Sequence, residues 1–245
     1  MAADIEKLAE QFKKQSPDIA FLLLSTAKVA RSLGIPESFD HIEQEHQRQS
    51  LVLAERFASK LGMSEEEYIS TMPPFPRRGG NYAERGLTVP LLVETRIPWM
   101  EAAKICGITV SSPFRYVSWE RRDDMGENWQ DNIFKMPDAP YSAWGQDGSK
   151  FISMSSSEVR SKLLEKDNKT YRPGRLLDAI AMLCVYPERC RGMHCNIVGS
   201  SIKERLYVPC VRPQYAVPGF DINHIDFKSS SYFPLVMAQE IGTLS

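Results

Sequence analysis

Hydrophobic positions in the first 72 residues recur every three or four residues, which is the spacing of amphipathic helices. Capping residues and prolines divide this pattern into four predicted helices. The clearest start is Ser64, which can form a capping box with Glu67, and Pro73 ends the helical pattern. We expect these helices to bury their apolar stripes on one another or on the chain that follows.

The pattern changes after residue 86. The run LTVPLLVETRI, from Leu87 to Ile97, is rich in β-branched residues and predicts a strand. Pro90 cannot donate a hydrogen bond to a neighbouring strand, so this strand is expected either to lie at the edge of its sheet or to begin late. Pro98 then begins a short helix that Gly107 closes.

Further signals follow in the second half of the chain. The turn residues of GQDG predict a β-hairpin centred at residues 147–148, and a second capping box begins at Ser155. Pro173 is expected to begin a helix that ends before Pro187. Two strands are expected on either side of residues 202–205, followed by an irregular tail.

The predicted elements are a group of helices followed by a mixture of helices and strands. This order predicts an α+β fold. We expect an N-terminal helical segment at residues 1–72 and a basic, Gly- and Pro-rich connection at residues 73–86. Residues 87–245 are expected to form an α+β domain with a mixed, largely antiparallel sheet and helices packed on it.

Composition narrows the function classes. The 245 residues carry 30 basic and 31 acidic side chains, so a net charge of -1 gives no overall attraction to nucleic acid or to an anionic membrane. Polar residues interrupt the apolar stretch near the amino end, so no membrane-spanning helix is predicted. No secretory signal is recognised, and five cysteines, an odd number, indicate reduced thiols; both favour a cytoplasmic location.

The connection contains the run RRGGNYAER. Glycines allow backbone N–H groups to converge on an anion, and arginine side chains bind carboxylate or phosphate through two hydrogen bonds. The run matches no nucleotide-binding motif, so the alternative is a solvated hinge. The candidate ligand-binding residues are Arg77, Arg78, Gly79, Gly80, Asn81 and Arg85.

Two other groups carry possible chemistry. Cys190, His194 and Cys195 include zinc-ligand types, but the spacing lacks the two close ligand pairs of a structural site, so neither a metal nor a cofactor is predicted. A weak catalytic group combines His224 and Asp221 with a nucleophile. The two candidate nucleophiles are Ser200 and Cys210.

Several blocks in the second half resemble, in order and spacing, an uncharacterised bacterial family described only as a domain of unknown function. The resemblance covers about residues 88–224 and rests on TRIPWMEAAKICG, MPDAPY, GSKFISMSSSEV, RPGRLLDAI, IVGSS, RLYVPCV and PGFDINH. Gly219, Phe220 and His224 correspond to the glycine, aromatic residue and histidine near the end of that family. Its tryptophan- and glycine-rich terminus is replaced here by SSSYFPLVMAQE. The resemblance implies a fold and a bacterial cytosolic setting, but no activity.

These observations favour a binding or accessory function, in which the Arg-Gly loop and neighbouring Arg96 and Arg115 present positive charge to a protein partner or a small acidic ligand. The alternative is a hydrolase or transferase that uses His224, Asp221 and a serine or cysteine. No nucleic-acid or membrane partner is expected, and oligomerisation is left open.

Overall fold

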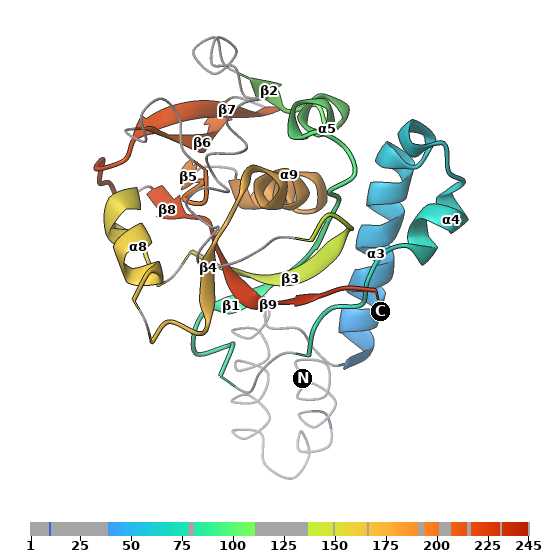
Figure 1. Ribbon diagram of the computed structural model, residues 1–245, viewed down its shortest axis with the longest axis horizontal. Helices are drawn as coiled ribbons and strands as arrows, with labels where there is room; N and C mark the ends of the chain where they lie inside the picture. The colour runs from blue at the N-terminus through green and yellow to red at the C-terminus, as the bar shows by residue number, and fades with distance from the viewer. Residues whose placement is uncertain are drawn as a thin grey trace.

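The helix α9 (Leu176–Val185) lies at the centre of the fold in the computed structural model, between two β-sheets (Figure 1). Its sequence, LLDAIAMLCV, is apolar except for Asp178, and every residue other than Leu177 is buried. A helix that is hydrophobic on all sides must be surrounded by other elements. Residues of both sheets and of helices α3 and α5 contribute to the hydrophobic core around it.

The structure describes residue 10 and residues 39–77, 81–110, 137–148, 150–165, 167–190, 194–200, 207–214, 217–230 and 232–244. The other helices are α3 (Phe39–Phe57), α4 (Glu65–Ser70), α5 (Trp99–Ile105) and α8 (Ser156–Leu163), with short 3-10 helices η1 (Ser59–Leu61) and η3 (Pro187–Cys190). The strands are β1 (Leu87–Val93), β2 (Thr109–Val110), β3 (Tyr141–Gln146), β4 (Tyr171–Pro173), β5 (His194–Asn196), β6 (Tyr207–Gln214), β7 (Val217–His224), β8 (Tyr232–Pro234) and β9 (Val236–Gly242).

The strands form two mostly antiparallel sheets, and the predicted α+β class is confirmed. The first sheet has the order β1-β3-β9-β4 and is antiparallel throughout. The second has the order β2-β7-β6-β5-β8, in which the β2–β7 and β5–β8 pairs are parallel. Its longest pairing is between β6 and β7, where Val211 lies opposite Phe220 and Cys210 opposite Asp221.

The edge strand β1 is paired on its open side by a side chain. Gln49 of α3 donates from Nε2 to the carbonyl of Pro90 at 2.8 Å and accepts at Oε1 from the amide of Leu92 at 2.9 Å. An unpaired strand edge would expose these backbone groups. The amide of Gln49 therefore replaces a neighbouring strand, and the edge position predicted from Pro90 is confirmed.

The local helix signals in the described residues are also confirmed. Ser64 and Glu67 form a reciprocal capping box at the start of α4, and Ser155 and Glu158 form another before α8. Gly107, after α5, has a φ of 68°, a conformation that glycine adopts without strain. The two helices predicted before residue 39 lie outside the described residues, apart from residue 10.

Three predictions about longer-range structure are wrong. Gly148 lies at a bend, with a φ of 93°, but β3 pairs with β1 and β9 instead of forming a hairpin with the residues that follow. Pro173 belongs to β4, and α9 begins at Leu176. The expected irregular tail contains three strands, and β9 lies inside the first sheet between β3 and β4.

In the ranges given above, no helix combines the length and the apolar character needed to cross a membrane.

Candidate functional site

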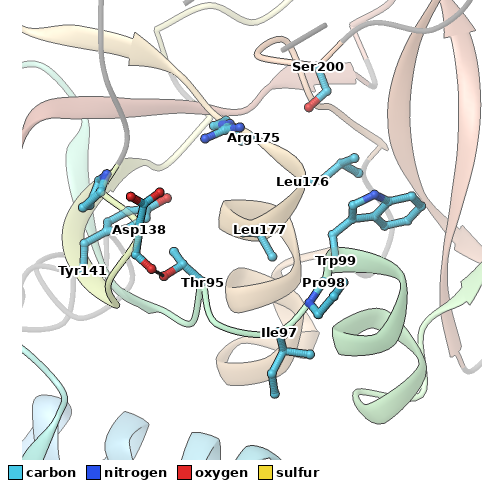
Figure 2. A pocket seen from close by; sticks show the side chains of 11 residues that line it. Thr95, Ile97, Pro98, Trp99, Asp138, Tyr141, Arg175, Leu176, Leu177 and Ser200 are labelled. Carbon is cyan, nitrogen blue, oxygen red and sulfur yellow. Dashed lines mark hydrogen bonds between the residues drawn. The ribbon is translucent and has the colours of Figure 1, made fainter. Parts of the chain in front are cut away.

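A cavity of about 340 Å³ opens beside the amino end of α9 (Figure 2). It lies where the segment after β1, the start of α5, the start of β3 and the turn after β5 meet. The described residues that line it are Thr95, Ile97, Pro98, Trp99, Pro137, Asp138, Tyr141, Arg175, Leu176, Leu177 and Ser200. Trp99 and Tyr141 are almost fully buried, so the walls of the cavity belong to the core.

The amino end of α9 is one wall of the cavity. Arg175 is the N-cap residue, and Leu176 and Leu177 form the first helical positions. The first N–H groups of a helix have no acceptor within the helix, and together they carry a partial positive charge. Figure 2 shows Arg175 at this end of the helix, so a full and a partial positive charge lie on the same side of the cavity.

A buried ion pair lies behind this wall. Arg172 of β4 donates from Nη1 to Oδ2 and from Nη2 to Oδ1 of Asp178, both at 2.8 Å, and neither side chain is exposed. The hydroxyl of Tyr141 donates to Oδ1 at 2.8 Å, and the amide of Arg175 donates to Oδ2 at 2.8 Å. The carboxylate of Asp178 is therefore saturated with donors inside the protein.

These contacts determine the protonation states of Asp178 and Tyr141. Burial acts to raise the pKa of Asp178, but the charge of Arg172 and the hydrogen bonds to the carboxylate outweigh burial, and the pKa is lowered. Burial and the charge of Asp178 raise the pKa of Tyr141 well above its usual value. Asp178 is accordingly ionised and Tyr141 neutral at physiological pH.

Two glycines allow the turn after β5 to approach the start of α9. The amide of Gly199 donates to the carbonyl of Gly174 at 2.8 Å. A Cβ atom at Gly199 would lie 2.5 Å from that carbonyl oxygen, and a Cβ atom at Gly174 would lie 2.3 Å from Cγ of Leu235. Only glycine fits this close approach, which brings Ser200 and Arg175 to one cavity.

Ser200 is positioned at the cavity by two hydrogen bonds to its backbone. Its carbonyl accepts from Nη2 of the buried Arg160 at 2.7 Å, and its amide donates to Ile197 at 3.2 Å. Ser200 is only 6% exposed, yet its hydroxyl makes no hydrogen bond to any residue that the structure describes. Figure 2 shows this hydroxyl directed toward the space between Arg175 and Trp99. The hydroxyl is therefore available to donate a hydrogen bond to a group bound in the cavity.

The Arg-Gly loop is described only in part. Arg77 and Asn81 are exposed, and Arg85 is half-buried, with its carbonyl accepting from the hydroxyl of Tyr171 at 3.0 Å. Arg78, Gly79 and Gly80 lie outside the described residues. The side chain of Arg85 lines a second cavity, of about 250 Å³, and is not among the residues that line the cavity at α9.

Arg96 is engaged within the protein. It makes two hydrogen bonds to the buried carboxylate of Glu94, at 2.6 and 2.9 Å, and a third to Thr71 at 3.1 Å. Its guanidinium also lies 5.1 Å from the ring centroid of Tyr68. The charge of Arg96 is thus compensated by Glu94, and Arg115 lies outside the described residues.

The candidate catalytic residues are not brought together. Asp221 and His224 are three residues apart in β7, so their side chains leave opposite faces of the sheet. Asp221 forms an ion pair with Arg212 at 2.9 Å, while Nδ1 of the exposed His224 accepts from the amide of Asp226. Among the described residues, His224 makes no hydrogen bond to Asp221, Ser200 or Cys210.

The thiols provide no activated nucleophile in the described part of the second sheet. Burial raises the pKa of Cys210 to about 11, which keeps the thiol protonated at physiological pH. His194 and Cys195 are consecutive in β5 and point to opposite faces. Within the described ranges, no group of three or more His, Cys, Asp or Glu side chains is arranged to hold a metal.

Sequence reasoning identified Ser200, as a candidate nucleophile, but missed Arg175. One available signal was the position of Arg175 at the start of an apolar helix, since a cation at a helix amino end opposes the helix dipole. An arginine in this unfavourable position indicates a candidate binding residue.

Comparisons with protein-family models, with curated proteins and with solved structures found no match. The resemblance to a domain-of-unknown-function family over residues 88–224 therefore remains an expectation from the sequence blocks alone.

Proposed function

We propose that this protein is a binding module for a small acidic ligand, and that the ligand's carboxylate lies in the cavity at the amino end of α9. One observation carries the proposal. The guanidinium of Arg175, the first amides of α9 and the hydroxyl of the buried residue Ser200 converge on one cavity. All three are hydrogen-bond donors, and a carboxylate accepts from each kind.

The expected interaction energies of these donors with a carboxylate support the proposal. A hydrogen bond to a charged group contributes about 1.5–3 kcal/mol, and a helix amino end contributes about 0.3–1 kcal/mol to binding an anion. Arg175 has five N–H donors in a planar fork, so it can bind a carboxylate while it serves another acceptor. The charge of Asp178 is already balanced by Arg172, and its carboxylate is saturated by internal donors. Asp178 therefore does not require the guanidinium of Arg175.

The size of the cavity favours a small molecule over a protein partner. A volume of about 340 Å³ lies at the lower end of the range of about 300–1,000 Å³ for small-molecule sites. Its walls include buried core residues, which a folded partner could not reach. The binding function is also favoured over hydrolysis, because the described residues give Ser200 no neighbouring base.

A cytoplasmic, bacterial setting is part of the same proposal. Four cysteines, Cys106, Cys184, Cys195 and Cys210, are free thiols, as expected in a reducing compartment. The bacterial origin rests on the sequence resemblance alone.

Isothermal titration with two carboxylates that share a phenyl group, 3-phenylpropionate and L-phenylalanine, tests the proposal. At least one should bind the wild type, and Arg175→Gln should weaken that binding by about tenfold or more, the effect of losing about 1.4 kcal/mol. Arg77→Gln is the matched control, since it removes an exposed arginine of the Arg-Gly loop that lies outside the cavity.

The results separate the two arginine sites. Loss of binding in Arg77→Gln with normal binding in Arg175→Gln would move the site to the Arg-Gly loop. Absence of binding by both compounds to the wild type would overturn the proposed carboxylate site. Circular dichroism and urea unfolding of each variant establish that the affinity change is not a folding defect.

A further inference from the structure

The carboxylate of Asp138 lies at the rim of the same cavity. Asp138 is exposed, and its carbonyl accepts from Oγ1 of Thr95 at 2.9 Å, which fixes the backbone where the rim begins. Within the ranges that the structure describes, the carboxylate of Asp138 makes no hydrogen bond and no ion pair. Figure 2 shows Asp138 and Arg175 on one side of the cavity and Trp99 on the opposite side.

The charges of the described lining residues are therefore balanced, one cation and one anion, Arg175 and Asp138. A ligand that carries only a carboxylate would be attracted by Arg175 and repelled by Asp138. A ligand that also carries an ammonium group can pair with both, and such complementary charges determine specificity. Asp178 cannot take the ammonium, because its oxygens already accept from Arg172, Tyr141 and the amide of Arg175.

The opposite side of the cavity is apolar. Trp99 is 3% exposed and is held by edge-to-face contact with Phe220, with ring centroids 6.4 Å apart. Ile97 and Leu176, also buried, extend this surface. A rigid indole with aliphatic neighbours binds an apolar or aromatic side chain and excludes water from it.

We propose that the ligand is an amino acid with an apolar side chain. Its carboxylate pairs with Arg175, the first amides of α9 and Ser200, its ammonium pairs with Asp138, and its side chain lies against Trp99. This inference rests on the proposed carboxylate site and adds the amine and the side chain to it. The size of the cavity agrees with a small molecule such as a free amino acid.

The test removes one charge of the ligand at a time. Isothermal titration compares L-phenylalanine with 3-phenylpropionate, which lacks the amine, and with 2-phenylethylamine, which lacks the carboxylate. L-phenylalanine should bind the wild type about tenfold or more tighter than either compound. In Asp138→Asn its advantage over 3-phenylpropionate should disappear, whereas the exposed control Asp167→Asn should keep the wild-type ratio.

The outcomes distinguish this inference from the function on which it rests. If 3-phenylpropionate binds as tightly as L-phenylalanine and both depend on Arg175, the carboxylate site stands and the amino-acid inference is overturned. If 2-phenylethylamine binds as tightly as L-phenylalanine, the carboxylate is irrelevant and both proposals are overturned. A wild-type preference for L-phenylalanine that persists in Asp138→Asn would assign the ammonium to another group and overturn the role of Asp138.

Discussion

Arg172 and Asp178 form a two-point ion pair that is completely enclosed, with both N–O distances at 2.8 Å and both side chains fully buried. The pair joins β4, at the edge of the first sheet, to the first turn of the central helix. It therefore fixes the orientation of the α9 amino end, which forms a wall of the cavity. A buried pair of this kind is costly to break, because one unpaired charge would remain in the interior.

We predict that Asp178→Asn destabilises the protein by about 3–5 kcal/mol, the usual effect of leaving one member of a buried ion pair without its partner. Asparagine keeps the size of the side chain and loses the charge that balances Arg172. The free energy of unfolding, from urea denaturation followed by circular dichroism, measures the loss.

The control for this variant is the exposed ion pair between Lys60 and Glu101, which are 51% and 39% exposed. Lys60→Gln should change the unfolding free energy by less than about 1 kcal/mol, because solvent screens an exposed pair. Equal effects of Lys60→Gln and Asp178→Asn would contradict the enclosure of the Arg172–Asp178 pair.

The hydrogen bond from Tyr141 to Asp178 predicts a pH dependence. Since the folded-state pKa of Asp178 is lowered, ionised Asp178 stabilises the fold above the unfolded pKa of about 3.9, and this contribution is lost as the pH falls through the folded value. Tyr141→Phe removes one donor and brings the folded pKa closer to the unfolded one. We expect the variant to be less stable by about 1.5–3 kcal/mol near neutral pH.

That stability gap should shrink as the solution is acidified, because protonated Asp178 gains less from the tyrosine hydroxyl. Urea unfolding of the wild type and of Tyr141→Phe over a series of decreasing pH values measures the gap at each pH. The gap should stay constant until the pH falls through the folded pKa of Asp178 in the variant, and a gap that does not shrink as Asp178 becomes protonated would contradict the predicted role of the hydroxyl.

A variant of Gln49 tests how the open edge of strand β1 is stabilised. Its side-chain amide bonds the carbonyl of Pro90 and the backbone amide of Leu92, so Gln49→Met leaves the amide of Leu92 without this partner. The carbonyl of Pro90 keeps a hydrogen bond from the hydroxyl of Tyr186 at 3.2 Å, so the expected cost is about 1–3 kcal/mol for the unpaired amide. Gln47→Met, on the exposed side of the same helix, is the control and should be nearly neutral. Urea unfolding of both variants measures the difference, and equal stabilities would refute the pairing role of Gln49.

The sequence predicts the elements whose signals act over a few residues. The capping boxes at Ser64 and Ser155, the helix from Pro98 to Gly107 and the edge position of Pro90 depend on neighbouring residues or on a single missing donor. Contacts within one turn or one strand decide these features, so they can be read from the local pattern.

Strand partners depend on long-range contacts, and there the local pattern fails. The chain does bend at Gly148, but the amide of Asp147 bonds the carbonyl of Gly86, and the chain leaves the sheet instead of returning along β3. The partner of β3 comes from the far end of the sequence, where Val236 and Met237 are fully buried in β9. Burial of that strand between β3 and β4, rather than its own propensity, fixes its conformation.

The difference between local signals and long-range contacts also applies to the residues of the cavity. Ser200 is marked by the VGSS run, but its position beside Arg175 follows from the Gly174–Gly199 contact, which joins segments that are 25 residues apart (199 − 174). His224 and Asp221 are close in sequence and lie on opposite faces of β7, because side chains alternate along a strand. Closeness in sequence was therefore a poor guide to which groups share the cavity.

The contact between Gly199 and Gly174 leads to the last prediction. A Cβ atom at residue 199 would lie 2.5 Å from the carbonyl oxygen of Gly174, so Gly199→Ala must push the turn that carries Ser200 away from the start of α9. Overpacking of this kind costs about 1–3 kcal/mol of stability. Because Ser200 moves with the turn, the affinity for L-phenylalanine should also fall, by about tenfold if one hydrogen bond to the carboxylate is lost.

Gly62→Ala separates the two effects. Gly62 has a φ of 69°, and a Cβ atom there would have no neighbour within 4 Å, so alanine strains the backbone without displacing another residue. It should cost about 1–2 kcal/mol, similar to Gly199→Ala, and leave the affinity unchanged, because Gly62 does not line the cavity. Isothermal titration and urea unfolding of both variants compare affinity at matched stability. Equal affinities in the two variants would mean that the Gly199 turn does not position Ser200 for the ligand.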